Sequence, residues 1–211
     1  MTYIKRDLES KILSLSKEYS AILITGPRQV GKTTVLRQLM QENRTYVTLD
    51  DLEDRAMAQK DPALFLQLHD RPILIDEVQY APQLFSYIKI EIDNGAEPGS
   101  FWLTGSQAFR MMELAQESLA GRVALLHMPS LSQHEIYGSG NTSPFSVDLN
   151  ALKERTKTHV PADMKEIYQR IWNGSMPGLI SGRFSDRDVF YSSYLQTYID
   201  RDVSELIHLT D

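Results

Sequence analysis

The chain has 211 residues, 42% of them hydrophobic, which is enough to bury one sizeable core and a small second module. It has no cysteine, which excludes disulfides, thiolate zinc sites and thiol nucleophiles, and its apolar runs are far shorter than the ~20 residues of a membrane span. The net charge of -6 argues against a surface built wholly for polyanions, so binding of nucleic acid is possible but unsupported. Charges near the N-terminus break any export signal, and we expect a cytoplasmic protein.

Short apolar runs alternate with helical patterns along residues 1–136. The predicted strands are residues 21–25, 45–49, 73–76, 101–104 and 123–128. Helices are predicted at 3–17, at 33–41, after Pro82 and at about 108–117. Because parallel strands need crossover connections, this alternation predicts an α/β fold with three layers, in which helices cover both faces of a parallel five-stranded sheet.

Two helix starts are predicted between the second and third strands. Asp50 and Glu53 have the spacing of a capping box, in which Asp50 bonds the first-turn amides and Glu53 reaches back. Pro62, directly after Asp61, is typical of the first turn of a helix.

The second part of the chain has a different pattern. Small, polar and turn-forming residues at 138–146 indicate a linker, which we place at residues 137–160. A helical segment follows at 161–211, with one helix from Pro161 to Gly174 and a longer one from near Ser185. The last residues read as the start of another helix, so we expect the chain to be part of a longer protein.

A phosphate-binding motif lies between the first predicted strand and the next helix. Its residues, which match G-x-x-x-x-G-K-[ST], are Gly26, Pro27, Arg28, Gln29, Val30, Gly31, Lys32 and Thr33. Glycines let successive backbone N–H groups converge on phosphate oxygens, and the helix N-terminus adds its positive end. We expect Lys32 to reach the β- and γ-phosphates of ATP and the Thr33 hydroxyl to bind Mg²⁺. Thr34 continues the binding segment, where packing or capping explains it better than ligation.

Two acids end the third predicted strand. Asp76 and Glu77 follow four uncharged residues and should lie at the carboxyl end of the sheet, where nucleotides bind in such folds. Asp76 fits the carboxylate that holds Mg²⁺, and Glu77 fits the residue that polarises the attacking water. Solvated or helix-capping acids are the alternative interpretation.

Two further candidates lie later in the chain. Ser106, after the fourth strand, is the first choice for a polar group near the γ-phosphate, and the alternative interpretation is that Thr104 and Ser106 satisfy turn amides and cap the next helix. Arg122 precedes the fifth strand and has the place of an arginine finger to a neighbouring subunit, while a surface ion pair is an equally good explanation.

Four motifs together resemble a bacterial and archaeal family of AAA+ ATPases, whose ATPase domain is usually followed by a C-terminal domain of uncertain role. They are residues 26–34, 75–79, 103–107 and 119–122. The resemblance implies AAA+ strand order, the roles given above for the two acidic and P-loop motifs, and a polar sensor near Ser106. It names no substrate.

Three functions are compatible with these motifs. The first is hydrolysis of ATP coupled to conformational change in an attached domain, a protein partner or a homo-oligomer. The second is a slowly hydrolysing ATP-dependent switch. The third is a small-molecule kinase, prompted by Asp50 and Asp51 at the position where P-loop kinases often hold the acceptor.

Overall fold

The computed structural model describes residues 3–106, 119–138, 146–157 and 161–198. The chain divides into two compact units, the first of which is Arg6–Pro129. The second holds the remaining C-terminal residues together with the extreme N-terminus. Among the described residues no helix is both long and apolar enough to cross a bilayer.

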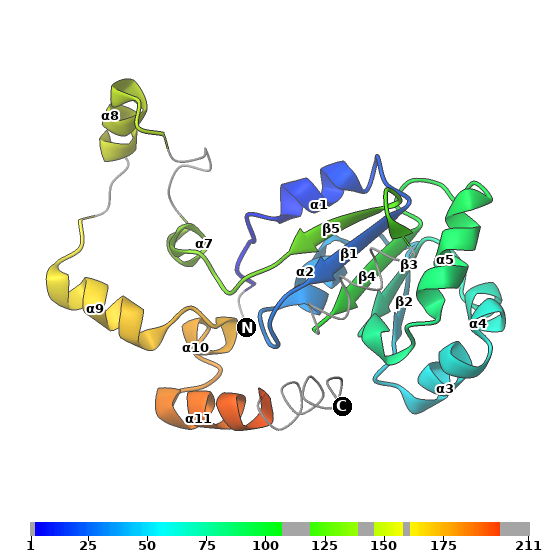
Figure 1. Ribbon diagram of the computed structural model, residues 1–211. Helices are drawn as coiled ribbons and strands as arrows, with labels where there is room; N and C mark the ends of the chain where they lie inside the picture. Colours follow the sequence, from blue (N-terminus) through cyan, green and yellow to red (C-terminus); the bar gives the residue numbers. More distant parts are fainter. Residues whose placement is uncertain (1–2, 107–118, 139–145, 158–160, 199–211) are drawn as a thin grey trace, which may run out of the picture. The chain divides into compact units, whose positions relative to one another are not determined.

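The first unit is built on a parallel five-stranded sheet. Its strands are β1 (Ala21–Thr25), β2 (Thr45–Thr48), β3 (Ile73–Asp76), β4 (Phe101–Gly105) and β5 (Val123–His127). They lie in the order β2-β3-β4-β1-β5, and all four neighbouring pairs are parallel (Figure 1). The predicted fold class is confirmed, and no strand bound differs from its prediction by more than one residue. Burial on both faces explains why these strands read as continuous apolar runs rather than alternating ones.

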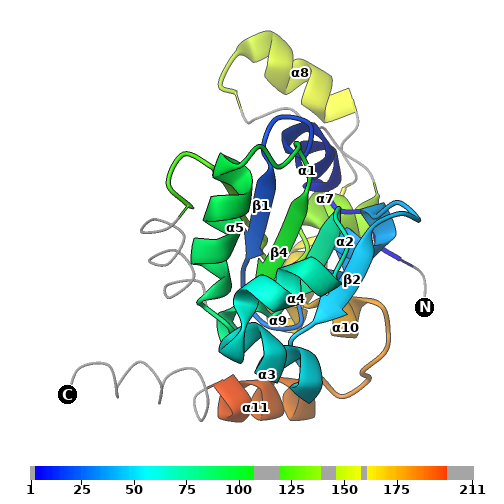
Figure 2. The same cartoon turned by 90° about the vertical axis from the view of Figure 1, so that its right-hand side faces the viewer.

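Helices cover both faces of this sheet (Figures 1 and 2). They are α1 (Glu9–Leu15), α2 (Lys32–Leu39), α3 (Leu52–Lys60), α4 (Pro62–Leu68) and α5 (Leu84–Asp93). The main core joins α3, α4 and α5 to one face, where Phe65, Phe85 and Ile88 pack with sheet residues such as Ile75 and Leu103. A short 3-10 helix, η1 (Val78–Tyr80), connects β3 to the segment before α5. The predicted helix at 108–117 lies outside the described residues.

The start of α3 corrects the predicted cap. Asp51, rather than Asp50, is the N-cap, and its side chain accepts hydrogen bonds from the amides of Glu53 and Asp54 at 2.9 and 3.1 Å. Two adjacent aspartates both satisfied the sequence pattern, and only the extended backbone at Asp51 decides between them. The predicted start at Pro62 is found, with Asp61 accepting from the Leu64 amide at 2.9 Å.

The second unit is helical where it is described. Its helices are α7 (Gln133–Tyr137), α8 (Leu149–Lys157), α9 (Met164–Asn173), α10 (Pro177–Ile180) and α11 (Arg187–Tyr198). Helix α8 falls inside the predicted linker at 137–160. The Asp148 carboxylate accepts hydrogen bonds from its first amides and so stabilises the start of this helix. The predicted boundary at residue 136 lies within α7, after the division between the two compact units. The three-part division of the chain stays a prediction.

We expect Asp51→Ala to lower the free energy of unfolding by about 1 kcal/mol, the usual cost of losing an N-cap side chain. Asp50→Ala is the matched control, because Asp50 is exposed and its ion pair with Arg55 is 3.7 Å long. Urea titration followed by circular dichroism measures both. Equal effects of the two substitutions would contradict the assignment of Asp51 as the cap.

Candidate functional site

The loop from Gly26 to Gly31 connects β1 to α2 and depends on its two glycines. Gly26 has a φ of +146°, and a Cβ placed there would lie 2.2 Å from the carbonyl oxygen of Met128. Gly31 is the left-handed N-cap of α2, with a φ of +93°. A side chain at either position would therefore strain the backbone, and at Gly26 it would also separate the loop from the segment after β5.

Lys32 lies inside this loop. Its side chain is almost fully buried, and Nζ donates to the carbonyl oxygens of Gly26 at 2.9 Å and Pro27 at 2.8 Å. The N-terminus of α2 has no side-chain cap. A buried ammonium group and the positive end of a helix thus meet at one place, which suits a bound anion such as a phosphate.

Arg6, which precedes α1, stabilises the loop through hydrogen bonds. This guanidinium is buried and donates to the carbonyl oxygens of Val30 and Pro129, both at 2.8 Å. It therefore connects the P-loop to the end of the segment that follows β5. Both of these partners are backbone carbonyls, so these two contacts are structural.

The carboxylate of Asp76, at the end of β3, accepts hydrogen bonds from three hydroxyl groups. Thr33 Oγ1 donates to its Oδ1 at 2.7 Å, Thr104 Oγ1 also donates to Oδ1, and the Tyr46 hydroxyl donates to Oδ2 at 3.3 Å. Burial, helped by the negative charge of Asp76, raises the pKa of Tyr46 and keeps the phenol a donor. The two residues predicted as magnesium ligands, Thr33 and Asp76, are thus in direct contact.

Glu77 begins a sharp reversal of the chain. Its φ of +56° places it in the left-handed region, which is uncommon for a residue with a side chain, and its amide donates to Thr104 Oγ1 at 3.2 Å. Gln79 Nε2 and Ser106 Oγ, the latter at the end of β4, donate to the carboxylate oxygen Oε2, Ser106 at 3.4 Å. The side chains of Glu77 and Ser106 are therefore neighbours.

The other predicted residues lie in different surroundings. Pro27, Gln29 and Thr34 are exposed, and Val30 is buried. Arg28, which is half-buried, belongs to the same loop between β1 and α2.

Arg122 makes a two-point ion pair with Asp93 on α5, at 2.6 and 3.2 Å. This is the surface ion pair that sequence reasoning weighed against an arginine finger, and the finger role stays a prediction.

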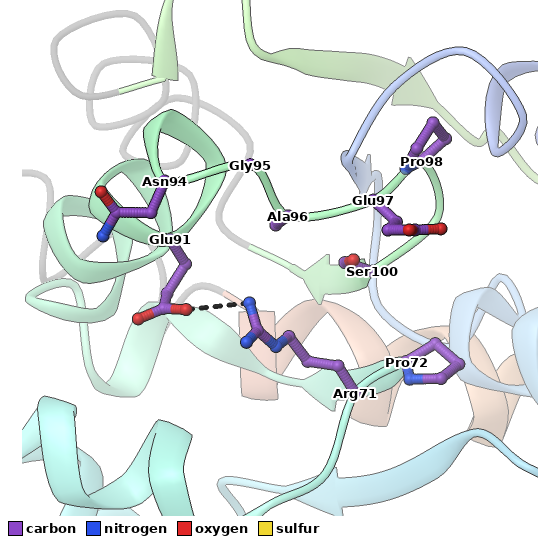
Figure 3. Close-up of a pocket in the computed structure, with 9 residues that line it drawn as sticks. All are labelled: Arg71, Pro72, Glu91, Asn94, Gly95, Ala96, Glu97, Pro98 and Ser100. Carbon is purple, nitrogen blue, oxygen red and sulfur yellow. Dashed lines mark hydrogen bonds and ion pairs between the residues drawn. The ribbon is translucent and has the colours of Figure 1, made fainter.

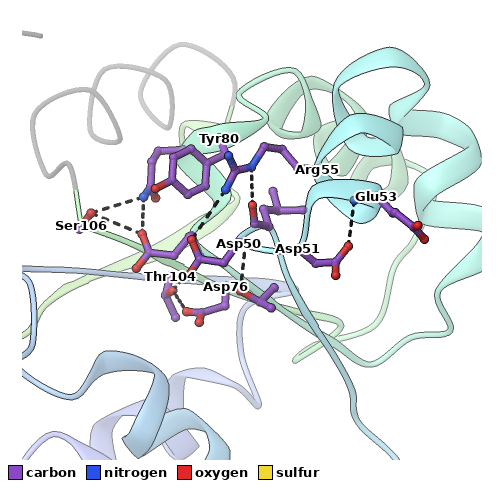
Figure 4. A network of polar contacts seen from close by, with 12 residues as sticks. Asp50, Asp51, Glu53, Arg55, Asp76, Tyr80, Thr104 and Ser106 are labelled. Carbon is purple, nitrogen blue, oxygen red and sulfur yellow. Dashed lines mark hydrogen bonds and ion pairs between the residues drawn. The ribbon is translucent and has the colours of Figure 1, made fainter. Parts of the chain in front are cut away.

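The acids after β2 have structural partners. Asp51 caps α3, and Asp50 faces Arg55, whose Nε donates to the Leu49 carbonyl at 2.6 Å (Figure 4). The Arg55 guanidinium also lies 3.9 Å from the centre of the Tyr80 ring. These contacts account for both aspartates without a phosphate acceptor.

Sequence reasoning missed three members of the site: Tyr46, Gln79 and the bridging role of Thr104. In the parallel register Ile75 pairs with Leu103, so the residues that follow them, Asp76 and Thr104, lie side by side. Knowledge of the strand order would have identified Thr104, whereas Gln79 belongs to the 75–79 motif but was assigned no role from the sequence.

A pocket of about 610 Å³ lies away from these groups, at the amino ends of β3 and β4. Arg71 and Glu91, which line it, are paired at 2.8 Å (Figure 3). Arg71 and Glu91 therefore satisfy each other's charge, and the residues predicted for the site lie at the opposite, carboxyl edge of the sheet.

Comparison with known proteins agrees with this geometry. A family model described as an AAA domain matches residues 18–137, which include the P-loop, both acids and Ser106. The chain belongs to this AAA family. Uncharacterized proteins of Mycobacterium bovis and Mycobacterium tuberculosis are each 29% identical to it over 206 residues, or 96% of the chain. The chain spans 40% of the length of these two relatives.

A solved structure supports the fold of this AAA protein. The Walker-type ATPase of Pyrococcus abyssi matches 99% of the chain and 76% of its own length with a TM-score of 0.56 at 18% identity. The predicted membership of an AAA-type P-loop family is confirmed, and at this coarse level the chain is a nucleotide-binding ATPase domain.

We expect Arg6→Met to weaken ATP binding and to destabilise the chain. The substitution removes two charge-assisted hydrogen bonds, each worth about 1.5–3 kcal/mol, and frees the loop carbonyl of Val30. Lys11→Met, at an exposed position on α1, is the control. Thermal unfolding and calorimetric titration with ATP measure both effects, and an Arg6→Met variant as stable as wild type would contradict the bracing role.

Proposed function

We propose that the chain binds ATP with magnesium and hydrolyses it. The observation that carries this proposal is the contact of 2.7 Å between Thr33 and Asp76, next to the buried ammonium group of Lys32. A hydroxyl and a carboxylate are the hard oxygen donors that magnesium prefers, so these two residues would hold the ion. When bound, magnesium neutralises charge on the phosphates.

Lys32 has the role of a phosphate ligand. Its ammonium group bonds two loop carbonyls, Gly26 and Pro27, and can exchange them for phosphate oxygens without leaving the loop. This rearrangement keeps the charge desolvated, where its attraction to phosphate is strongest. Backbone N–H groups of residues 26–33 supply further donors, as the two positive-φ glycines permit.

Glu77 has the role of the base. Hydrolysis joins a water oxygen to the γ-phosphorus and breaks its bond to the bridging oxygen of ADP, while a proton leaves the water. The Glu77 carboxylate, which accepts hydrogen bonds from Gln79 and Ser106, can polarise that water and take the proton. Ser106 is close enough to the same carboxylate to bind the water or the γ-phosphate.

We infer that this hydrolysis is coupled to a conformational change in an attached domain or a partner. The greater length of the curated relatives supports this inference. The alternative function, an ATP-dependent switch, would differ only in a slower rate of ATP hydrolysis. Turnover that stays slow with every partner or nucleic acid tested would favour the switch. The hypothesis of a small-molecule kinase is no longer supported by Asp50 and Asp51, because both residues make structural contacts.

Lys32→Ala should abolish tight binding of ATP, because it removes the buried positive charge from the loop. Lys11→Ala changes an exposed lysine in the same way and should bind as wild type does. Isothermal titration calorimetry measures the dissociation constants. Unchanged affinity in Lys32→Ala would overturn the location of the site.

Glu77→Gln should retain binding of ATP and reduce kcat by about 10²- to 10⁴-fold, the usual contribution of a general base. Release of inorganic phosphate measures the rate, and chelation of magnesium should stop hydrolysis by the wild-type chain. A Glu77→Gln variant with the wild-type rate would exclude Glu77 as the base.

A further inference from the structure

Gln79 is buried beside the proposed base, although the sequence assigned it no role of its own within the 75–79 motif. It lies in η1, two residues after Glu77, and its side chain is only 5% exposed. Its Nε2 donates to Glu77 Oε2 and reaches Ser106 Oγ at 3.3 Å (Figure 4). The amide group therefore links the ends of β3 and β4 through the carboxylate of Glu77.

The orientation of this amide follows from its partner. An ionised carboxylate can only accept hydrogen bonds, so the NH₂ group of Gln79, and not its oxygen, must face Glu77. The amide oxygen, Oε1, is then directed elsewhere. It is buried, and no donor among the described residues reaches it.

This unsatisfied oxygen argues against a purely structural role. A buried acceptor without a partner destabilises a fold, and an apolar side chain of the same volume would avoid that cost. The residue at this position nevertheless carries an amide, and the NH₂ end of that amide contacts Glu77. Such a local cost is expected where a residue serves the site rather than the stability of the chain.

We propose that Gln79 is a positioning residue for ATP hydrolysis, which holds the carboxylate of Glu77 toward the end of β4. The inference rests on the proposed function of Glu77 as the base. Glu77 occupies a left-handed backbone conformation, and its carboxylate accepts from two donors, Gln79 and Ser106. The Ser106 contact, at 3.4 Å, is long for a hydrogen bond between oxygens, so Gln79 is needed as a second donor to hold the carboxylate.

The decisive variant is Gln79→Met in the 211-residue chain, which keeps the volume and removes the amide. We expect kcat to fall at least tenfold while the dissociation constant for ATP stays within about twofold and Tm stays equal or rises. Gln83→Met is the matched control, because Gln83 is exposed at the start of α5 and its side chain makes no capping hydrogen bond. It should keep the wild-type kcat.

A double-mutant cycle separates positioning from packing. If Gln79 acts through Glu77, adding Gln79→Met to Glu77→Gln should not lower kcat further. Gln79→Leu repeats the test with a second apolar side chain, so that a packing defect peculiar to methionine does not decide the result. Wild-type kcat in both Gln79 variants, or an equal additional loss in the Glu77→Gln background, would overturn the proposal.

The same measurements distinguish this inference from the proposed function. If the wild-type chain does not hydrolyse ATP, or if Glu77→Gln hydrolyses it normally, the proposed function fails and the role of Gln79 fails with it. If Glu77→Gln is inactive while both Gln79 variants match wild type, only the role of Gln79 is wrong.

Discussion

The hydrogen bond from Thr33 to Asp76 joins two segments that are 43 residues apart, and the rest of the site is arranged around it. Thr33 is in the first turn of α2, whose start is set by Gly31, and Asp76 is the last residue of β3. The two meet because all strands are parallel and their carboxyl ends lie at one edge of the sheet. Every proposed phosphate, metal and water contact is within reach of that edge.

The P-loop keeps its shape through contacts with distant residues as well as through its own glycines. Gly26 packs against the Met128 carbonyl, and Arg6 bonds both Val30 and Pro129. The loop is thus held between the segment before α1 and the segment after β5. A preorganised anion site avoids the cost of ordering the loop when phosphate binds.

The acidic pair divides into two environments. Asp76 is surrounded by hydroxyl donors from β2, α2 and β4, and its oxygens suit the proposed contact with a cation. Glu77 turns away through its left-handed backbone and is held by Gln79 and Ser106. The Thr104 hydroxyl contacts both the Asp76 carboxylate and the Glu77 amide, so one side chain links the two acidic residues.

The sequence by itself determined the strands, the P-loop and the acidic pair, because each depends on local patterns of apolar, glycine and charged residues. It wrongly assigned the cap to Asp50, since only the backbone conformation shows that Asp51 takes this position. Tertiary structure alone decided the roles of Thr104 and Gln79. Thr104 reaches Asp76, and Gln79 reaches Ser106, across the β3–β4 pair, whose order and register no local pattern contains, so these contacts exist only once the sheet has formed.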